Sequence, residues 1–303
     1  MDKSPRFGKP SGRSRSLRIG FTLPINYLTG NISNKADVWW QEIYGSIDEC
    51  LKTLKELGVT SIEINELCAE TPPIQLKQGV ETIRDAGLGI TVHGWLPEME
   101  DESDIPLGVR ELEKTLIEHK QQDTIPFTVH SHESDMSATK SQITRQTLHD
   151  LNLLTMALAK NSVFKAALEI CRHKDRQSVG VTFSDTLFMA KQIGFRNLGL
   201  CWDVGHSQAN YCKKKDSRLP CDEFTKNVIH THIHDIGPDG RTHGPVLADQ
   251  GYVKDCIDIL KNSGYNGIYN LELSPILWGV SPGECRSYIE SSINSITRML
   301  INY

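Results

Sequence analysis

The feature that most constrains the fold is a repeat of short apolar strands and amphipathic helices, which starts at Leu17 and continues to the end of the chain. Eight segments have the length and the apolar pattern of strands, and a helical pattern follows most of them. They are residues 17–24, 60–67, 89–97, 125–133, 164–171, 197–203, 227–235 and 267–275. This alternation predicts an α/β protein, a single (β/α)8 barrel spanning residues 17–303, rather than an open doubly wound sheet.

The helices are predicted from their apolar periodicity and from the glycines that end several of them. We expect helices over 46–57, 73–86, 109–122, 140–160, 182–193, 252–262 and 282–301. The polar stretch before residue 46 contains Trp39 and Trp40. These two side chains are interpreted as packing residues, with a wall of a substrate pocket as the alternative.

Composition excludes several classes of protein. The net charge of −5 argues against a nucleic-acid surface, because such a domain is usually basic. No apolar run approaches the roughly 20 residues of a membrane span. The eight cysteines form no CxxC pair and follow no signal peptide, so we expect a reduced, cytoplasmic protein. Residues 1–16 are rich in Lys, Arg, Ser and Gly and are predicted to form a disordered basic tail.

Ionisable residues stand at or near the carboxyl ends of six consecutive predicted strands. Burying one carboxylate without a partner costs several kcal/mol, so strands seldom carry such groups inward without a function. In parallel α/β proteins the carboxyl ends of the strands form the edge that holds the ligand. The residues are His93, His130, Glu169, Asp203 with His206, His232 and Glu272.

A divalent metal ion is the simplest partner that would neutralise these groups together. Glu169, Asp203, His232 and Glu272 supply three carboxylates and one imidazole. This oxygen-rich set suits Mn²⁺, Mg²⁺ or Co²⁺ better than an ion that prefers thiolates. Cys201 is interpreted as a core residue and Cys171 as a residue that could line the pocket.

Three motifs resemble those of the xylose isomerase-like TIM barrels, from Leu17 to the end of the chain. They are DVGH at 203–206, HIHD at 232–235 and NLELSP at 270–275. This superfamily includes sugar and sugar-phosphate isomerases and epimerases, inosose dehydratases and the family-2 apurinic endonucleases. The chain departs from the pattern at His234, where a lysine is common, so the resemblance specifies the metal better than the substrate.

The resemblance implies roles for individual residues. Glu169, Asp203, His232 and Glu272 would bind the metal, and the two glutamates would also serve as acid and base. His206 would hold a substrate hydroxyl, and His93 would be a substrate-side or second-metal residue. Further residues are predicted to bind substrate from strand ends or the loops after them, where cations can hold phosphate or hydroxyl groups: His130, Arg172, Lys174 and Arg241.

The predicted function is therefore a metal-dependent isomerase or epimerase acting on a sugar, a sugar phosphate or a cyclitol through an enediolate. An inosose dehydratase would use the same first step. A zinc phosphodiesterase of the endonuclease type would need a further Asp-x-His, and the nearest match is Asp239 to His243. A sugar-binding barrel without activity is the third hypothesis. A homo-oligomer is compatible with this prediction, and no membrane partner is expected.

Overall fold

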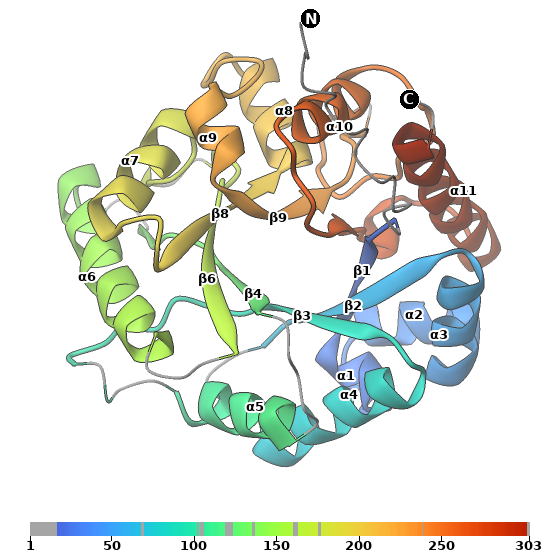
Figure 1. The fold of residues 1–303 in the computed structure, drawn as a ribbon. Coiled ribbons are helices and arrows are strands. Elements are labelled where there is room, and N and C mark those ends of the chain that lie inside the picture. The colour runs from blue at the N-terminus through green and yellow to red at the C-terminus, as the bar shows by residue number, and fades with distance from the viewer. Residues whose placement is uncertain are drawn as a thin grey trace, which may run out of the picture.

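Eight parallel strands form a closed barrel, which helices surround (Figure 1). The computed structural model describes residues 17–67, 70–101, 103, 106–118, 124–134, 137–159, 163–174, 177–237 and 239–301. The strand order around the barrel is β1-β10-β9-β8-β6-β4-β3-β2, so each strand lies beside its neighbours in the chain. The predicted single (β/α)8 barrel is confirmed. The predicted tail over residues 1–16 lies outside the described residues.

All eight barrel strands fall within, or one residue from, the predicted segments. The structure shortens most of them at the carboxyl end, where the chain leaves the barrel. The bounds are β1 Ile19–Pro24, β2 Val59–Asn65, β3 Gly89–His93, β4 Ile125–Val129, β6 Phe164–Glu169, β8 Leu198–Asp203, β9 Val228–Ile233 and β10 Tyr269–Leu271. The two remaining strands, β5 Glu133–Ser134 and β7 Gln177–Ser178, pair antiparallel outside the barrel.

The seven predicted helices are all present in the structure. They are α3 Ile47–Glu56, α4 Pro73–Asp85, α5 Leu107–Glu118, α6 Lys140–Leu158, α7 Phe183–Ile193, α10 Tyr252–Asn262 and α11 Pro282–Ile301. The predicted ends of α5 and α6 at residues 122 and 160 lie outside the described residues. Elements that the sequence analysis did not predict are α1 Ile25–Leu28, α2 Lys35–Tyr44, α8 Val204–Cys212, α9 Asp222–Lys226 and the 3-10 turn η1 Pro275–Leu277.

Helix α2 occupies the polar stretch that contains the two tryptophans. Its N-terminus has a capping box, in which the Asn34 side chain accepts from the Asp37 backbone N–H and the Asp37 carboxylate accepts from the Asn34 backbone N–H. On the buried face, the Trp40 ring stacks between Tyr27 and Tyr44, with ring centroids 6.3 Å apart in each pair. The interpretation of Trp40 as a packing residue therefore agrees with the structure.

Backbone register brings the ends of the later strands to one level of the barrel. Asp203 on β8 pairs with His232 on β9, and His232 pairs with Asn270 on β10. Glu272 follows Asn270 by two residues and therefore lies on the same face of its strand. The carboxyl end of the barrel thus gathers the acidic and imidazole side chains in one place.

No helix in the described residues is long and apolar enough to span a membrane. The seven cysteines that the structure describes are all free thiols. Cys201 is fully buried in the barrel, as expected for a core residue, whereas Cys171 lines a cavity at the carboxyl end.

Candidate metal centre

Glu169, Asp203, His232 and Glu272 meet at the carboxyl end of the barrel, and we refer to them as the carboxylate–histidine centre. Each offers one ligand atom, and these four atoms all lie within 4.8 Å of one another. Three of the side chains are fully buried and Glu272 is nearly so. They come from the ends of β6, β8, β9 and β10. These four strands are consecutive neighbours in the barrel, and their ends therefore lie close together.

The atoms of this centre approach one another closely without pairing as hydrogen bonds. His232 Nδ1 lies 3.1 Å from Glu169 Oε2 and 3.2 Å from Glu272 Oε2. Nevertheless, these three atoms have no hydrogen-bond partner among the described residues. Ligands that share a cation at about 2.0–2.2 Å are separated by similar distances and direct their lone pairs at the ion. The geometry therefore fits a bound metal ion better than a hydrogen-bonded cluster.

Burial and mutual charge shift the pKa values in the centre. Burial raises the pKa of Asp203 to about 6, and the nearby His206 offsets only part of this rise. Burial also acts to raise the pKa of Glu169 and Glu272, but surrounding imidazoles hold both pKa values well below their usual range. Burial acts to lower the pKa of His232, yet Cys201 and the neighbouring carboxylates raise it well above its usual value.

A buried carboxylate from the opposite side of the barrel supports His232. Glu63 Oε1 lies 3.0 Å from His232 Nε2, and Glu63 Oε2 forms a hydrogen bond of 2.7 Å with His230 Nε2. The hydroxyl of Thr22 and the amide of Asn270 also donate to Glu63, each at 3.0 Å. Nε2 of His232 faces Glu63 at ion-pair distance without a hydrogen bond in this structure, and Nδ1 faces the centre. This placement is similar to that of a metal ligand with an outer carboxylate.

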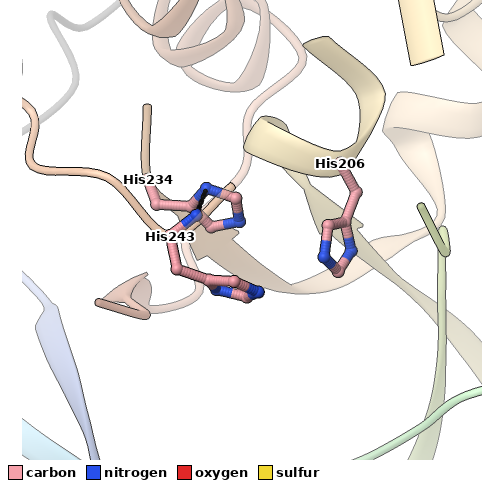
Figure 2. A group of neighbouring side chains, drawn as sticks. All are labelled: His206, His234 and His243. Atoms are coloured by element: carbon pink, nitrogen blue, oxygen red, sulfur yellow. Dashed lines mark hydrogen bonds between the residues drawn. The ribbon is translucent and has the colours of Figure 1, made fainter. Parts of the chain in front are cut away.

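Three further histidines, His206, His234 and His243, lie close to one another, and we refer to them as the histidine trio (Figure 2). One ring nitrogen from each of His206, His234 and His243 lies within 4.8 Å of the others. The His243 backbone N–H donates to His234 Nδ1 at 2.9 Å, so Nε2 of the same ring carries the hydrogen. This Nε2 lies 3.0 Å from Asp203 Oδ1, to which it can donate.

Of the residues predicted at strand ends, His93, His130 and Glu272 line a cavity of about 770 Å³. His93 lies 3.5 Å from Glu169 and 3.4 Å from Glu272, and His130 lies 3.2 Å from Glu169. The cavity is also lined by Arg172 and His206. Arg241 is not among the lining residues. Instead it forms an ion pair with Asp239 in an exposed loop, where its side chain is 59% exposed.

Sequence reasoning gave no role to Glu63, His230 or His234, and it considered His243 only within the nearest match to the Asp-x-His of a zinc phosphodiesterase. Glu63 could have been identified as an acidic residue on a predicted buried strand. His230 and His234 could have been identified because they alternate with His232 along one strand. His243 lies in a loop and has a left-handed backbone conformation, with a φ of 61°. Only the tertiary structure brings this loop residue against the barrel.

Comparison with known proteins agrees with the fold. A family model described as xylose isomerase-like TIM barrel matches residues 51–284. No curated protein is a significant match to the sequence. Among solved structures, a D-allulose 3-epimerase from Methylomonas sp. has a TM-score of 0.64 and 13% identity, with 93% of this chain and 98% of that chain covered.

Two other solved structures are similar at the level of the fold. An L-ribulose 3-epimerase has a TM-score of 0.64 and 17% identity, with 94% of this chain and 95% of that chain covered. The IolI protein, solved with a bound zinc atom, has a TM-score of 0.59 and 17% identity, with coverages of 95% and 99%. Because the family model matches most of the chain and the barrel is closed, this protein belongs to the xylose isomerase-like TIM barrel family.

Proposed function

We propose that this protein is a divalent-metal-dependent isomerase or epimerase that acts on a sugar or a related cyclitol. The observation that carries the proposal is the carboxylate–histidine centre, in which Glu169 lies 3.1 Å and Glu272 lies 3.2 Å from His232 Nδ1. The sugar epimerases among the similar solved structures support the reaction class, and the zinc atom in the IolI structure supports a metal.

The metal would be held by Glu169, Asp203, His232 and Glu272. Three carboxylates and one imidazole form a hard, oxygen-rich set, which favours Mn²⁺, Mg²⁺ or Co²⁺. Carboxylate oxygens of Glu169 and Glu272 that are buried without hydrogen-bond partners fit this role. When bound, such a cation polarises a substrate carbonyl and stabilises the charge that develops on its oxygen.

The protein itself would move the proton. One of Glu169 and Glu272 would take the proton from the carbon beside the carbonyl, and the other would return a proton to the product. A carboxylate with a low pKa is a weak base in water, but removing water from the closed site strengthens its interaction with the substrate. His93, between the two glutamates, and His206, at the start of α8, would hold hydroxyl groups.

The reaction class can be tested by hydrogen exchange with solvent. The Mn²⁺-loaded protein would be incubated in deuterium oxide with a panel of ketoses and inososes, and deuterium incorporation would be followed by NMR. We expect exchange at one carbon beside the carbonyl in at least one compound. Metal-loaded protein that exchanges none of them would exclude proton abstraction. A product that has lost water would indicate a dehydratase with the same first step.

A zinc phosphodiesterase is the second candidate, and the histidine trio is the observation in its favour. One ring nitrogen from each of the three histidines lies close enough to the others for a further zinc ion, although both nitrogens of His234 are engaged by the His243 N–H and by Asp203. However, Asp239, the acid expected from the sequence, pairs with Arg241 at an exposed position and belongs to none of the ligand groups found among the described residues. Two or more zinc ions per chain together with cleavage of abasic DNA would establish this function instead.

A further inference from the structure

One wall of the cavity is formed by two loops that are hydrogen-bonded to each other. The loop after β4 contains β5, Glu133–Ser134, which pairs with β7, Gln177–Ser178, in the loop after β6. Nearer the barrel, the hydroxyl of Ser131 donates to the Val179 carbonyl at 2.6 Å and lies 3.7 Å from Cys171 Sγ. These contacts between the two loops give the side chains on the wall defined positions.

The basic side chains on this wall differ in whether they have an acidic partner. Lys174 forms an ion pair with Glu133 at 3.1 Å, and His132 is hydrogen-bonded to the buried carboxylate of Asp150 at 2.7 Å. Arg172 forms no ion pair with any residue that the structure describes. Among the described residues of this wall, it is therefore the cation whose charge is left for a ligand.

The surroundings of Arg172 leave it short of hydrogen-bond acceptors. Its Nη1 atom donates to Thr242 Oγ1 at 3.3 Å, and Thr242 is only 6% exposed. Its Nε–H is buried and has no partner among the described residues. Leaving a buried donor unpaired costs about 1–3 kcal/mol, and more for a charged group. A planar guanidinium is best satisfied by an oxyanion that accepts two hydrogen bonds side by side.

Arg172 also lies close to the carboxylate–histidine centre. Arg172 and Glu272, one member of the centre, line the same cavity, and Thr242 is followed in the chain by His243, whose Nδ1 lies 3.7 Å from Glu272 Oε2. The cavity volume of about 770 Å³ is within the range of small-molecule sites. One small ligand in this cavity can therefore contact Arg172 and Glu272 at the same time.

We propose that Arg172, with the Thr242 hydroxyl, forms an oxyanion subsite, and that the substrate is an acidic sugar derivative bearing a phosphate or a carboxylate. The identification of the ligand as a sugar rests on the proposed function, whereas the anion subsite does not. The positive charge of Arg172 would offset the repulsion between an anionic group and the three carboxylates of the centre. Arg241, the other candidate from the sequence, is already paired and lies outside this subsite.

The experiment measures binding and turnover separately, with the metal-loaded full-length chain. Calorimetric titration with inorganic phosphate and with acetate would be performed on the native protein, Arg172→Gln, Arg172→Lys and Thr242→Val. Arg145→Gln is the matched control, because it removes one exposed arginine charge on α6 without breaking an ion pair among the described residues. Ketoses, their terminal phosphate esters and the matching sugar acids would then be compared as substrates.

We expect Arg172→Gln to weaken binding of the preferred anion by about tenfold to a hundredfold, as for loss of a charged hydrogen bond. Arg172→Lys should recover part of this loss and Arg145→Gln should show none. Preference for phosphate over acetate, or the reverse, identifies the anionic group. Equal anion affinity in native protein and Arg172→Gln would overturn the subsite even if the protein is an epimerase. Anion binding that depends on Arg172, without deuterium exchange in any sugar, would retain the subsite and reject the proposed function.

Discussion

Gly205 lies directly against the imidazole of His234. A β-carbon at position 205 would overlap with the Cε1 and Nδ1 atoms of that ring. The absence of a side chain at Gly205 therefore allows His234 to reach Asp203, whose Oδ1 atom is 3.0 Å from His234 Nε2. Gly205 of the DVGH motif thus makes room for the His234 ring, which contacts Asp203 of the same motif.

Gly205→Ala should displace His234 and weaken metal binding. Because an outer hydrogen bond orients the ligand, its loss is expected to lower metal affinity by about tenfold to a hundredfold. Competition with a chelator would measure this change. Gly283→Ala is the matched control, since a β-carbon there meets no atom within 4 Å. Identical metal affinity in both variants would show that His234 does not position Asp203.

Glu63→Gln should weaken the same metal site from the other side of the barrel. The neutral amide cannot balance His230 and His232, so His232 loses the partner that fixes which nitrogen faces the centre. We expect about a tenfold to hundredfold loss of metal affinity, measured in the same competition assay. The exposed Glu56→Gln serves as the control, and retained affinity in Glu63→Gln would argue that His232 is held by packing alone.

Glu272→Gln should abolish most of the exchange of substrate hydrogen with solvent. The amide keeps the shape of the side chain but cannot accept the proton, and general acid–base catalysis typically contributes about 10²–10⁴-fold. Rates would be compared at saturating metal, with metal content determined for each sample. A variant that binds metal and exchanges at the native rate would remove Glu272 from the proposed proton transfer.

Metal binding should strengthen as the pH rises. In the metal-free protein the pKa of His232 is raised well above its usual value, and the pKa of Asp203 is about 6. Both groups must give up their protons to bind a cation, so protons compete with metal at low pH. Between pH 6 and 8, where Asp203 is already largely ionised, we expect affinity to rise by up to about tenfold per pH unit through the proton that His232 releases. Calorimetry in buffers of different ionisation enthalpy would count those protons, and a count of zero would contradict the pKa shifts.

Asn34→Ala should destabilise the fold without altering the metal site. The variant removes the side chain that accepts from the backbone N–H groups of Ala36 and Asp37 at the start of α2. Loss of such a cap costs about 1 kcal/mol of unfolding free energy, which urea denaturation would measure. Asn34→Asp is a suitable control, because aspartate caps equally well. Equal loss in both variants would indicate that Asn34 acts through another contact.

The sequence by itself determined the architecture and the members of the carboxylate–histidine centre as candidates. Strand periodicity, helix-ending glycines and segment lengths are local properties, so they could be recognised without tertiary information. The acids at strand ends could also be recognised, because a parallel barrel carries all carboxyl ends to one edge. Helix α2 was missed although its capping box and its buried residues Trp40, Ile43 and Tyr44 follow helical spacing.

Tertiary structure alone decided which polar groups support the centre. Glu63 and His230 are separated by 167 residues in the chain, and they meet only because the barrel closes. His243 comes from a loop whose path no strand pattern specifies. Arg172 and Arg241 both follow strand ends in the sequence, but Arg172 contacts Thr242 whereas Arg241 pairs with Asp239. Local periodicity fixes which elements form, whereas contacts between distant side chains depend on closure of the barrel and on the packing of its loops.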